Sequence, residues 1–174
     1  MAAIKRKVFI SYYHAEDQWY KEYIETNFQD QIINKSVGMG DIDTDNSTNY
    51  IKRLIQQDNI SDTSVVIVLI GPNTRKRKHV DWEISAGLMA KVGGVSSLIG
   101  VMLPELAQSG ENRWYWDDMP ARFADNGKTG YAIFYKWDYF INNFSSIVNT
   151  AFENKAVLKD KIDNSRIQMT RNLP

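Results

Sequence analysis

The stretch from Thr63 to Ile70, TSVVIVLI, decides the fold of this 174-residue chain. It is an apolar, largely β-branched run without polar alternation, and the sequence GPN at 71–73 closes it. Such a run is typical of a strand that is buried on both faces, as in a parallel sheet covered by helices. We therefore expect Val65–Ile70 to be the central strand of the protein.

A helical pattern follows this strand and predicts a helix over His79–Ala90. Apolar or small residues recur there at the 3.6-residue spacing of one helix face: Val80, Ile84, Gly87 and Leu88. Glu83 falls on the border of that face. Because ligands collect at the carboxyl ends of the strands in open α/β sheets, Glu83 is a candidate to line a recess there. A solvated surface glutamate is the plainer alternative.

Strands and helices alternate along the whole chain. The predicted strands are 7–12, 36–39, 65–70, 97–103 and 131–137, and the predicted helices are 17–32, 50–59, 79–90 and 140–152, with irregular chain over 105–130. This order predicts a three-layer α/β domain, flavodoxin-like in outline, with a central parallel sheet of four or five strands and helices on both faces. We expect one domain over residues 1–160 and a polar tail over 161–174.

The composition excludes several classes of function. Lysine and arginine (21) balance aspartate and glutamate (21), so no overall field steers the chain to nucleic acid or to an anionic membrane. There is no cysteine for a disulfide or a thiolate metal site, and only two histidines, His14 and His79. We predict no metal and no bound cofactor. No apolar stretch approaches the roughly 20 residues of a membrane span or forms a signal-peptide core, so a cytoplasmic protein is expected.

Three segments have open interpretations at this stage. The polar loop 34–49 is either a solvated loop or a lid over the neighbouring pocket. The basic run Arg75–Lys78 is either a solvated turn or a receiver for nucleic acid or for the phosphates of a dinucleotide. The aromatic run Trp114–Trp116 covers the edge of the sheet, stacks a flat ligand or meets a partner.

Three stretches of the sequence resemble TIR domains. The sequence VFISY at 8–12, leading to Asp17, is similar to the opening of a TIR domain. The strand 63–71 followed by VDWEI at 80–84 resembles the third strand and catalytic helix of short prokaryotic TIR-like domains, and MPARF at 119–123 with Asp125 and Asn126 resembles a late stretch of the same group. The similarity spans about residues 7–150. It is greatest to the TIR proteins of the two-gene Thoeris antiphage system.

The resemblance implies an NAD+-processing enzyme of antiphage defence, a glycohydrolase or ADP-ribosyl cyclase. In such proteins a helix glutamate, matching Glu83, cleaves the nicotinamide–ribose bond. The ADP-ribosyl group is then cyclised or joined to another group to make a nucleotide second messenger. The implied partners are NAD+ as substrate, an effector protein reached through the diffusible signal, a phage-derived trigger and further copies of the same chain.

The resemblance also implies a set of substrate-binding residues: Ser11, Tyr12, Tyr13 and His14 in the loop after the first strand, Asp43 and Asp45 in the next loop, and Trp82 beside Glu83. The chain departs from the pattern of the family at two places. His79 stands where many TIR enzymes have a tryptophan, one turn before the glutamate. Tyr13 and His14 replace arginines that often follow the first strand. These departures affect base stacking and phosphate contacts more than the role of Glu83.

TIR domains also act as non-enzymatic, self-associating adaptors, so a protein-interaction module is the competing function. A Glu83 side chain in a recess favours the enzyme, whereas one turned to open solvent or held in an ion pair favours the adaptor. A phospho-receiver would need an acidic pair after the first strand and an aspartate after the third. The sequences FISY and IGP at those places contain neither.

Overall fold

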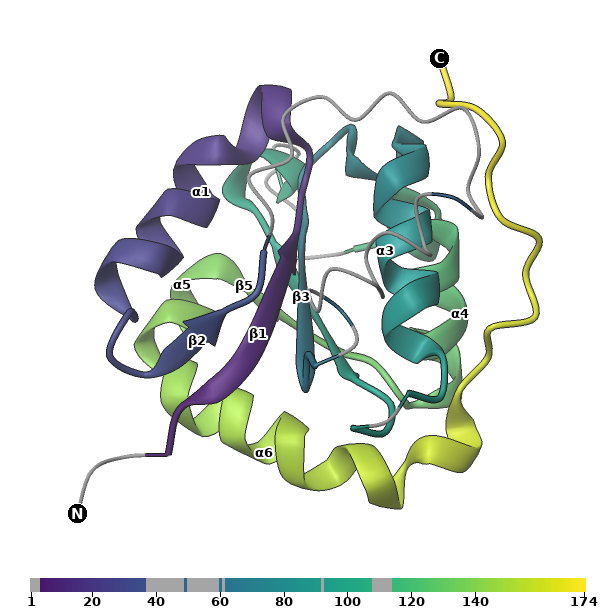
Figure 1. The fold of residues 1–174 in the computed structure, drawn as a ribbon. Coiled ribbons are helices and arrows are strands. Elements are labelled where there is room, and N and C mark those ends of the chain that lie inside the picture. Colours follow the sequence, from purple (N-terminus) through teal and green to yellow (C-terminus); the bar gives the residue numbers. More distant parts are fainter. Residues whose placement is uncertain (1–3, 37–48, 50–59, 61, 92, 108–113) are drawn as a thin grey trace.

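The protein is built on a five-stranded, wholly parallel sheet with the order β2-β1-β3-β4-β5 (Figure 1). This computed structural model describes residues 4–36, 49, 60, 62–91, 93–107 and 114–174. The strands are β1 (Arg6–Ser11), β2 (Ile32–Asn34), β3 (Val65–Ile70), β4 (Ser97–Met102) and β5 (Ile133–Lys136). The predicted fold class, a three-layer α/β domain on a parallel sheet, is confirmed.

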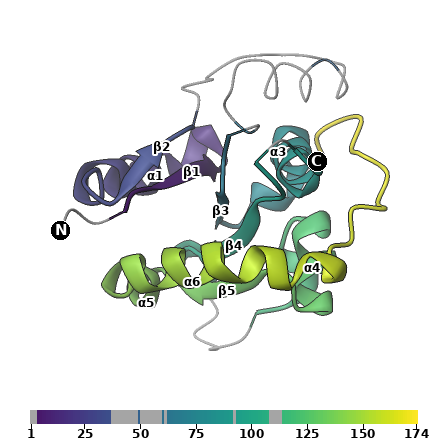
Figure 2. The same ribbon diagram turned by 60° about the horizontal axis from the view of Figure 1, so that its bottom comes forward.

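Helices cover both faces of the sheet (Figures 1 and 2). One face carries α1 (His14–Asn27), α5 (Trp137–Asn142) and α6 (Phe144–Val157), and the other carries α3 (Lys78–Leu88) and α4 (Ala121–Thr129). Short 3-10 turns connect them: η1 (Thr74–Lys76), η2 (Pro104–Ala107), η3 (Trp116–Asp118) and η4 (Lys159–Lys161). Within the residues that the structure describes, no helix is long and apolar enough to cross a membrane.

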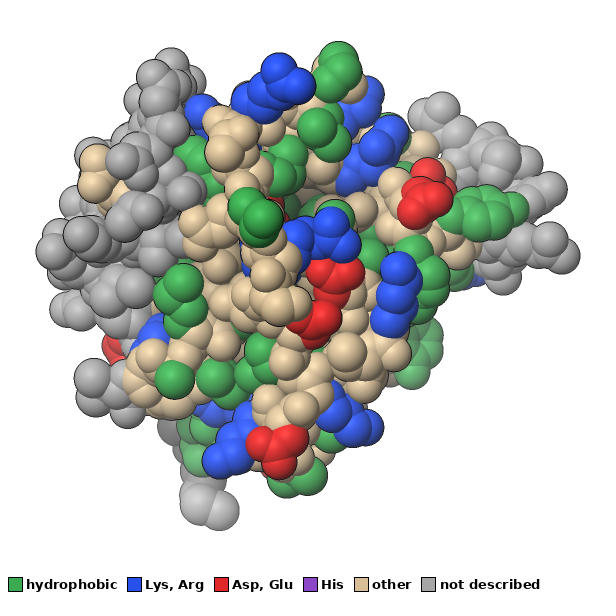
Figure 3. Space-filling model, turned by 90° about the vertical axis from the view of Figure 1, so that its right-hand side faces the viewer, with side chains coloured by type: hydrophobic (Ala, Val, Ile, Leu, Met, Phe, Trp, Pro, Cys, Tyr) green, Lys and Arg blue, Asp and Glu red, His purple; other side chains and the backbone are tan. Residues whose placement is uncertain are grey.

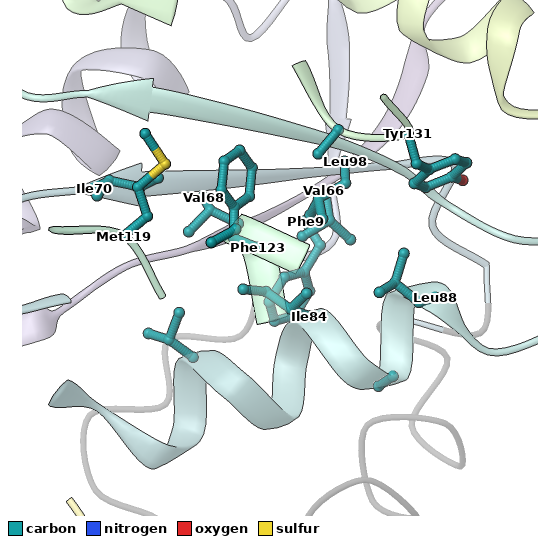
Figure 4. Close-up of a cluster of buried hydrophobic side chains, with 14 of the residues drawn as sticks. Phe9, Val66, Val68, Ile70, Ile84, Leu88, Leu98, Met119, Phe123 and Tyr131 are labelled. Atoms are coloured by element: carbon teal, nitrogen blue, oxygen red, sulfur yellow. The ribbon is translucent and has the colours of Figure 1, made fainter. Parts of the chain in front are cut away.

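The central strand β3 is buried on both faces, as its sequence predicts. None of its six side chains is more than 1% exposed. Val65, Ile67 and Leu69 pack in the core beneath α1, α5 and α6. The alternating residues Val66, Val68 and Ile70 pack in the core beneath α3 and α4 (Figure 4). A strand with apolar neighbours on both sides has no solvated face, which explains the absence of polar alternation.

The second strand and the start of the first helix lie elsewhere than predicted. The second strand β2 comes at Ile32–Asn34, where Ile32 is buried and pairs with Arg6. Of the strand predicted over 36–39, the structure describes only Ser36, which lies after β2 and in no strand. Asp17, where the first helix is predicted to begin, lies within its first turn because α1 already begins at His14. The helix predicted over 50–59 lies outside the described residues.

The segment 105–130, predicted to be irregular, contains the helix α4. Its buried residues include Arg122 and Asn126, and these polar side chains at core positions conceal the apolar spacing that marks a helix. Gly130 ends the helix in the left-handed conformation, at φ 84°. On the inner side, Phe123 packs directly on β4 because Gly100 has no side chain there; a Cβ at Gly100 would overlap the Phe123 ring.

The single helix predicted over 140–152 is in fact two helices. The break falls at Asn143, which leaves helical geometry at φ −129° and ψ 23°. Its side-chain amide donates to the Tyr139 carbonyl oxygen at 2.9 Å, which satisfies a carbonyl at the end of α5.

In the aromatic run Trp114–Trp116, the two tryptophans cover the core and the tyrosine between them is exposed. Trp114 and Trp116 are half-buried against the core, and Trp116 packs on Gly127 and edge-on to Phe134. Tyr115 is 57% exposed. Structural cover therefore accounts for the two tryptophans.

The residues after η4 run along the outer side of α3 and α4 (Figure 1, yellow). Seen from that side, basic and acidic side chains alternate with apolar ones (Figure 3). Enclosed between the sheet and this segment, every residue of α3 from Val80 to Leu88 is buried. The segment is tied to α3 by hydrogen bonds from Asn164 Nδ2 to the Ser85 carbonyl (3.1 Å), from the Met169 N–H to Asp81 Oδ2 (2.9 Å) and from the Lys78 N–H to Asn172 Oδ1 (2.9 Å).

Candidate active site

The candidate site lies at the carboxyl ends of β1 and β3. Strand order reverses here, because the chain continues from β1 outward to β2 and then returns to β3 on the other side of β1. In open α/β sheets such a switch point leaves a crevice between the loops that follow the two strands. The loop after β1 begins at Tyr12, and the turn after β3 runs from Gly71 to Thr74.

Glu83 is buried against the end of β1. The residue is 5% exposed, and Ser11, the last residue of β1, is fully buried. The Ser11 hydroxyl donates a hydrogen bond to Glu83 Oε2. This bond fixes the direction of the carboxylate. The Glu83 side chain is therefore not turned to open solvent, as a surface residue of an adaptor would be.

One turn before Glu83, His79 holds the same loop. Its Nε2 atom lies 3.0 Å from the Tyr12 carbonyl oxygen. Because a carbonyl oxygen only accepts hydrogen bonds, Nε2 carries the proton. Burial lowers the pKa of His79, so the ring is neutral at pH 7 and Nδ1 bears a lone pair. His79 thus fixes the backbone of the loop next to Ser11.

Aromatic rings line the loop beside these contacts. The ring centres of Tyr12 and His14 lie 4.2 Å apart, and those of His14 and His79 lie 5.5 Å apart. The Tyr12 hydroxyl donates to Gln18 Oε1 at 2.7 Å. Burial, with smaller contributions from nearby carboxylates, raises the pKa of Tyr12 to about 12. The phenol therefore acts as a hydrogen-bond donor and not as a base near neutral pH.

The loop after β1 lies alongside the first half of α3. Tyr13 extends the series of contacts made by Ser11 and Tyr12, because the Arg77 guanidinium carbon lies 4.3 Å from the centre of its ring. Ser11, Tyr12 and Tyr13 thus contact Glu83, His79 and Arg77 in turn, and His14 again contacts His79. The loop therefore lies along the line from Glu83 to Arg77, the residue that precedes α3.

Another acidic group, Asp17, lies in the first turn of α1 behind the turn after β3. It is 3% exposed, and Thr74 Oγ1 donates to its Oδ2 at 3.4 Å. A Cβ at Gly71 would lie 3.0 Å from both carboxyl oxygens, so glycine makes room for this group. Burial, with a smaller contribution from Glu16, raises the pKa of Asp17 to about 7. Nothing in the residue spacing around Asp17 indicates that its side chain is buried.

The structure brings together five of the residues expected at the site: Ser11, Tyr12, Tyr13, His14 and Glu83. Trp82, also expected at the site, contacts the C-terminal segment. It is 1% exposed, and its Nε1 donates to the Met169 carbonyl oxygen at 2.7 Å. The donor edge of this indole is therefore engaged by the C-terminal segment. Asp43 and Asp45 lie outside the described residues.

A buried ion pair behind the site was not predicted. Arg122 of α4 is fully buried and donates from Nε to Asp81 Oδ1 at 2.8 Å and from Nη2 to Asp81 Oδ2 at 3.3 Å. The pair joins α3, which carries Glu83, to α4. The only sequence signal for it was the place of Arg122 in the MPARF stretch, because nothing in the spacing of residues 81 and 122 indicates contact.

The fold and the site together define a TIR-like domain: a parallel sheet of order 2-1-3-4-5 with a buried helix glutamate against the loop after β1. The family model of the TIR-like domain of the Thoeris protein ThsB matches residues 9–108, more than half of the chain. The chain therefore belongs to the ThsB family of TIR proteins, which act in antiphage defence. The matched residues include the loop after β1 and the whole of α3. A search of curated proteins finds no match.

Proposed function

We propose that this protein cleaves the bond between nicotinamide and ribose in NAD+ and converts the ADP-ribosyl group into a cyclic or conjugated nucleotide signal. The observation that carries the proposal is the buried Glu83 carboxylate, held by Ser11 at the carboxyl end of β1.

A single carboxylate suits this reaction. The ring nitrogen of the nicotinamide is positively charged in NAD+, so nicotinamide leaves as a neutral molecule with the bonding electron pair and requires no general acid. The positive charge then develops on the ribose. An oriented anion stabilises that charge more than it stabilises the neutral ribose of the ground state. Because Glu83 is 5% exposed, solvent screens this attraction little.

The second half of the reaction forms a new bond at C1′ of the ribose. An oxygen or nitrogen atom donates its lone pair to the carbon, and the attacking group then loses a proton, from the atom itself or from an N–H conjugated with it. A hydroxyl or ring nitrogen of the ADP-ribosyl group itself yields a cyclic product, a separate molecule yields a conjugate, and water yields ADP-ribose. The burial of Ser11 and Glu83 limits the access of water and favours the first two outcomes.

The biological setting follows from the family. As a ThsB-type TIR protein, this chain would make the nucleotide in response to a phage-derived trigger, and the nucleotide would reach an effector protein by diffusion. We propose self-association as a further requirement, so that activity rises steeply with protein concentration or with the trigger. Full turnover by a strictly monomeric, unstimulated preparation would contradict that requirement.

The test is incubation of the purified protein with NAD+, with and without lysate of infected cells, followed by resolution of the products by mass. We expect release of nicotinamide and appearance of an ADP-ribosyl product. Its mass should equal that of cyclic ADP-ribose for a cyclic product and exceed it for a conjugate. NAD+ that stays intact under both conditions, from a protein that nevertheless self-associates, would favour the adaptor function.

A further inference from the structure

Three cations of the basic run Arg75–Lys78 contact different parts of the molecule: Arg75, Arg77 and Lys78. Arg75 lines a hollow of about 270 Å³ together with Trp116 and Arg166. Lys78 places its Nζ 5.3 Å from the centre of the Trp82 ring. Arg77, in contrast, extends over the loop after β1. The run is therefore not one uniform solvated patch, and Arg77 is the member of it that reaches the candidate site.

Arg77 is stacked on Tyr13, and its Nε lacks an acceptor among the described residues. The guanidinium lies over the Tyr13 ring, a contact that uses its flat face and leaves the N–H donors in its plane available. Its Nε is buried and has no hydrogen-bond partner, and no carboxylate among the described residues pairs with it. A buried N–H without an acceptor is costly, so this position favours an incoming anion.

The loop on which Arg77 rests has no cation of its own. From Ser11, through this loop and the first turn of α1 to Asp17, the sequence reads SYYHAED, with two carboxylates and no lysine or arginine. A cationic contact to an anion at this loop must therefore come from another element. Arg77 also directly precedes α3, an 11-residue helix whose amino-terminal N–H groups and dipole favour negative charge at the same end.

We infer that Arg77 binds the diphosphate of the dinucleotide substrate. This inference rests on the proposed function, because it assumes a ribose at Glu83. Arg77 precedes Glu83 by six residues, a rise of about 9 Å along a helix. The diphosphate is attached to the 5′ carbon of that ribose and extends along the surface formed by α3 and the loop. Arg77 offers it two parallel N–H donors in a fork that fits phosphate oxygens.

The experiment is calorimetric titration of the protein with ADP-ribose, which carries the diphosphate, and with nicotinamide riboside, which lacks it. Arg77→Gln should weaken ADP-ribose binding roughly 10- to 100-fold, since hydrogen bonds to a charged group are lost, and should leave nicotinamide riboside binding unchanged. Arg77→Lys keeps the positive charge but lacks the two parallel N–H donors, so its affinity for ADP-ribose should lie between those of the parent and of Arg77→Gln. The matched control, Arg75→Gln, removes the same charge from the same turn and should bind ADP-ribose like the parent.

Two results overturn the inference. In the first, Arg77→Gln binds ADP-ribose with the affinity of the parent. In the second, Arg77→Gln loses affinity for ADP-ribose and for nicotinamide riboside equally, which would indicate a general disturbance of the loop. If the parent cleaves NAD+ while either result is found, the inference alone fails and the proposed function stands. If the parent neither binds ADP-ribose nor cleaves NAD+, both fail. Thermal unfolding of each variant checks that a loss of binding is not a loss of fold.

Discussion

Replacing Arg122 by methionine should strongly destabilise the protein. The substitution keeps an unbranched side chain of similar length but leaves the Asp81 carboxylate, whose side chain is 5% exposed, with the Met169 N–H as its remaining partner. Arg122 Nη1 also donates to Asn164 Oδ1 at 2.9 Å, so the C-terminal segment loses an anchor as well. Breaking a buried ion pair by removing one partner typically costs about 3–5 kcal/mol.

The expected loss is large on the scale of a domain of this size. Each 1 kcal/mol lowers the melting temperature by about 2–4 °C for 150–250 residues, so Arg122→Met should melt about 6–20 °C below the parent. The assay is urea and thermal unfolding followed by circular dichroism. The double variant Asp81→Leu with Arg122→Met should be more stable than the sum of the two single changes predicts, because it removes both charges.

The matched control is Arg166→Met, which breaks the pair between Arg166 and Asp125 at the surface, where the Arg166 side chain is 45% exposed. That change should cost at most about 1 kcal/mol. An Arg122→Met protein that loses no more stability than Arg166→Met would show that the buried pair does not hold α3 against α4.

Three further changes test other contacts. Gly100→Ala should lower the free energy of unfolding by about 1–3 kcal/mol, because the new methyl overlaps the Phe123 ring; an unchanged urea midpoint would contradict this. Asp17 has a folded-state pKa of about 7, raised by burial above its usual 3.8, so its contribution to stability is fully present below about pH 4 and is lost as the pH rises through 7. Asp17→Asn should therefore gain stability relative to the parent between pH 5 and pH 8, and a difference in unfolding free energy that is the same at both pH values argues against a buried titrating carboxyl. Ser11→Ala should leave the fold intact but reduce NAD+ turnover roughly 10- to 100-fold, because Glu83 loses the donor that orients it. Turnover equal to that of the parent would show that Ser11 does not orient Glu83 for the reaction.

The sequence predicted best where apolar pattern alone determines the structure. Val65–Ile70 is uniformly apolar because it meets helices on both sides, so its sequence signal is unambiguous. The helix after it followed from apolar spacing, with its ends displaced by one or two residues. In α4 the same reasoning failed because Arg122 and Asn126 occupy core positions, where they are satisfied by partners distant in the sequence, Asp81 and Asp163. Long-range polar pairing leaves no local pattern to detect.

The site could be predicted only in part for the same reason. Glu83 stood out because it interrupts the border of an apolar face, and the family resemblance added the loop after β1. The stacking of Arg77 on Tyr13 and the bond of His79 to the Tyr12 carbonyl depend on how the loop and the helix lie against each other. That arrangement is set by the packing of α3 on the sheet and has no expression in residue spacing.

Whether the Glu83 carboxylate drives cleavage of NAD+ is tested by the rate at which the Glu83→Gln variant consumes NAD+. The amide can still accept the Ser11 hydrogen bond, so the variant should fold like the parent while losing the negative charge. Glu153→Gln, which makes the same change at an exposed position of α6, is the matched control. We expect Glu83→Gln to turn over NAD+ roughly 10²- to 10³-fold more slowly than the parent, the usual effect of removing one electrostatic partner of the transition state, and Glu153→Gln to match the parent. A well-folded Glu83→Gln protein that consumes NAD+ at the parent rate would contradict this role of the carboxylate.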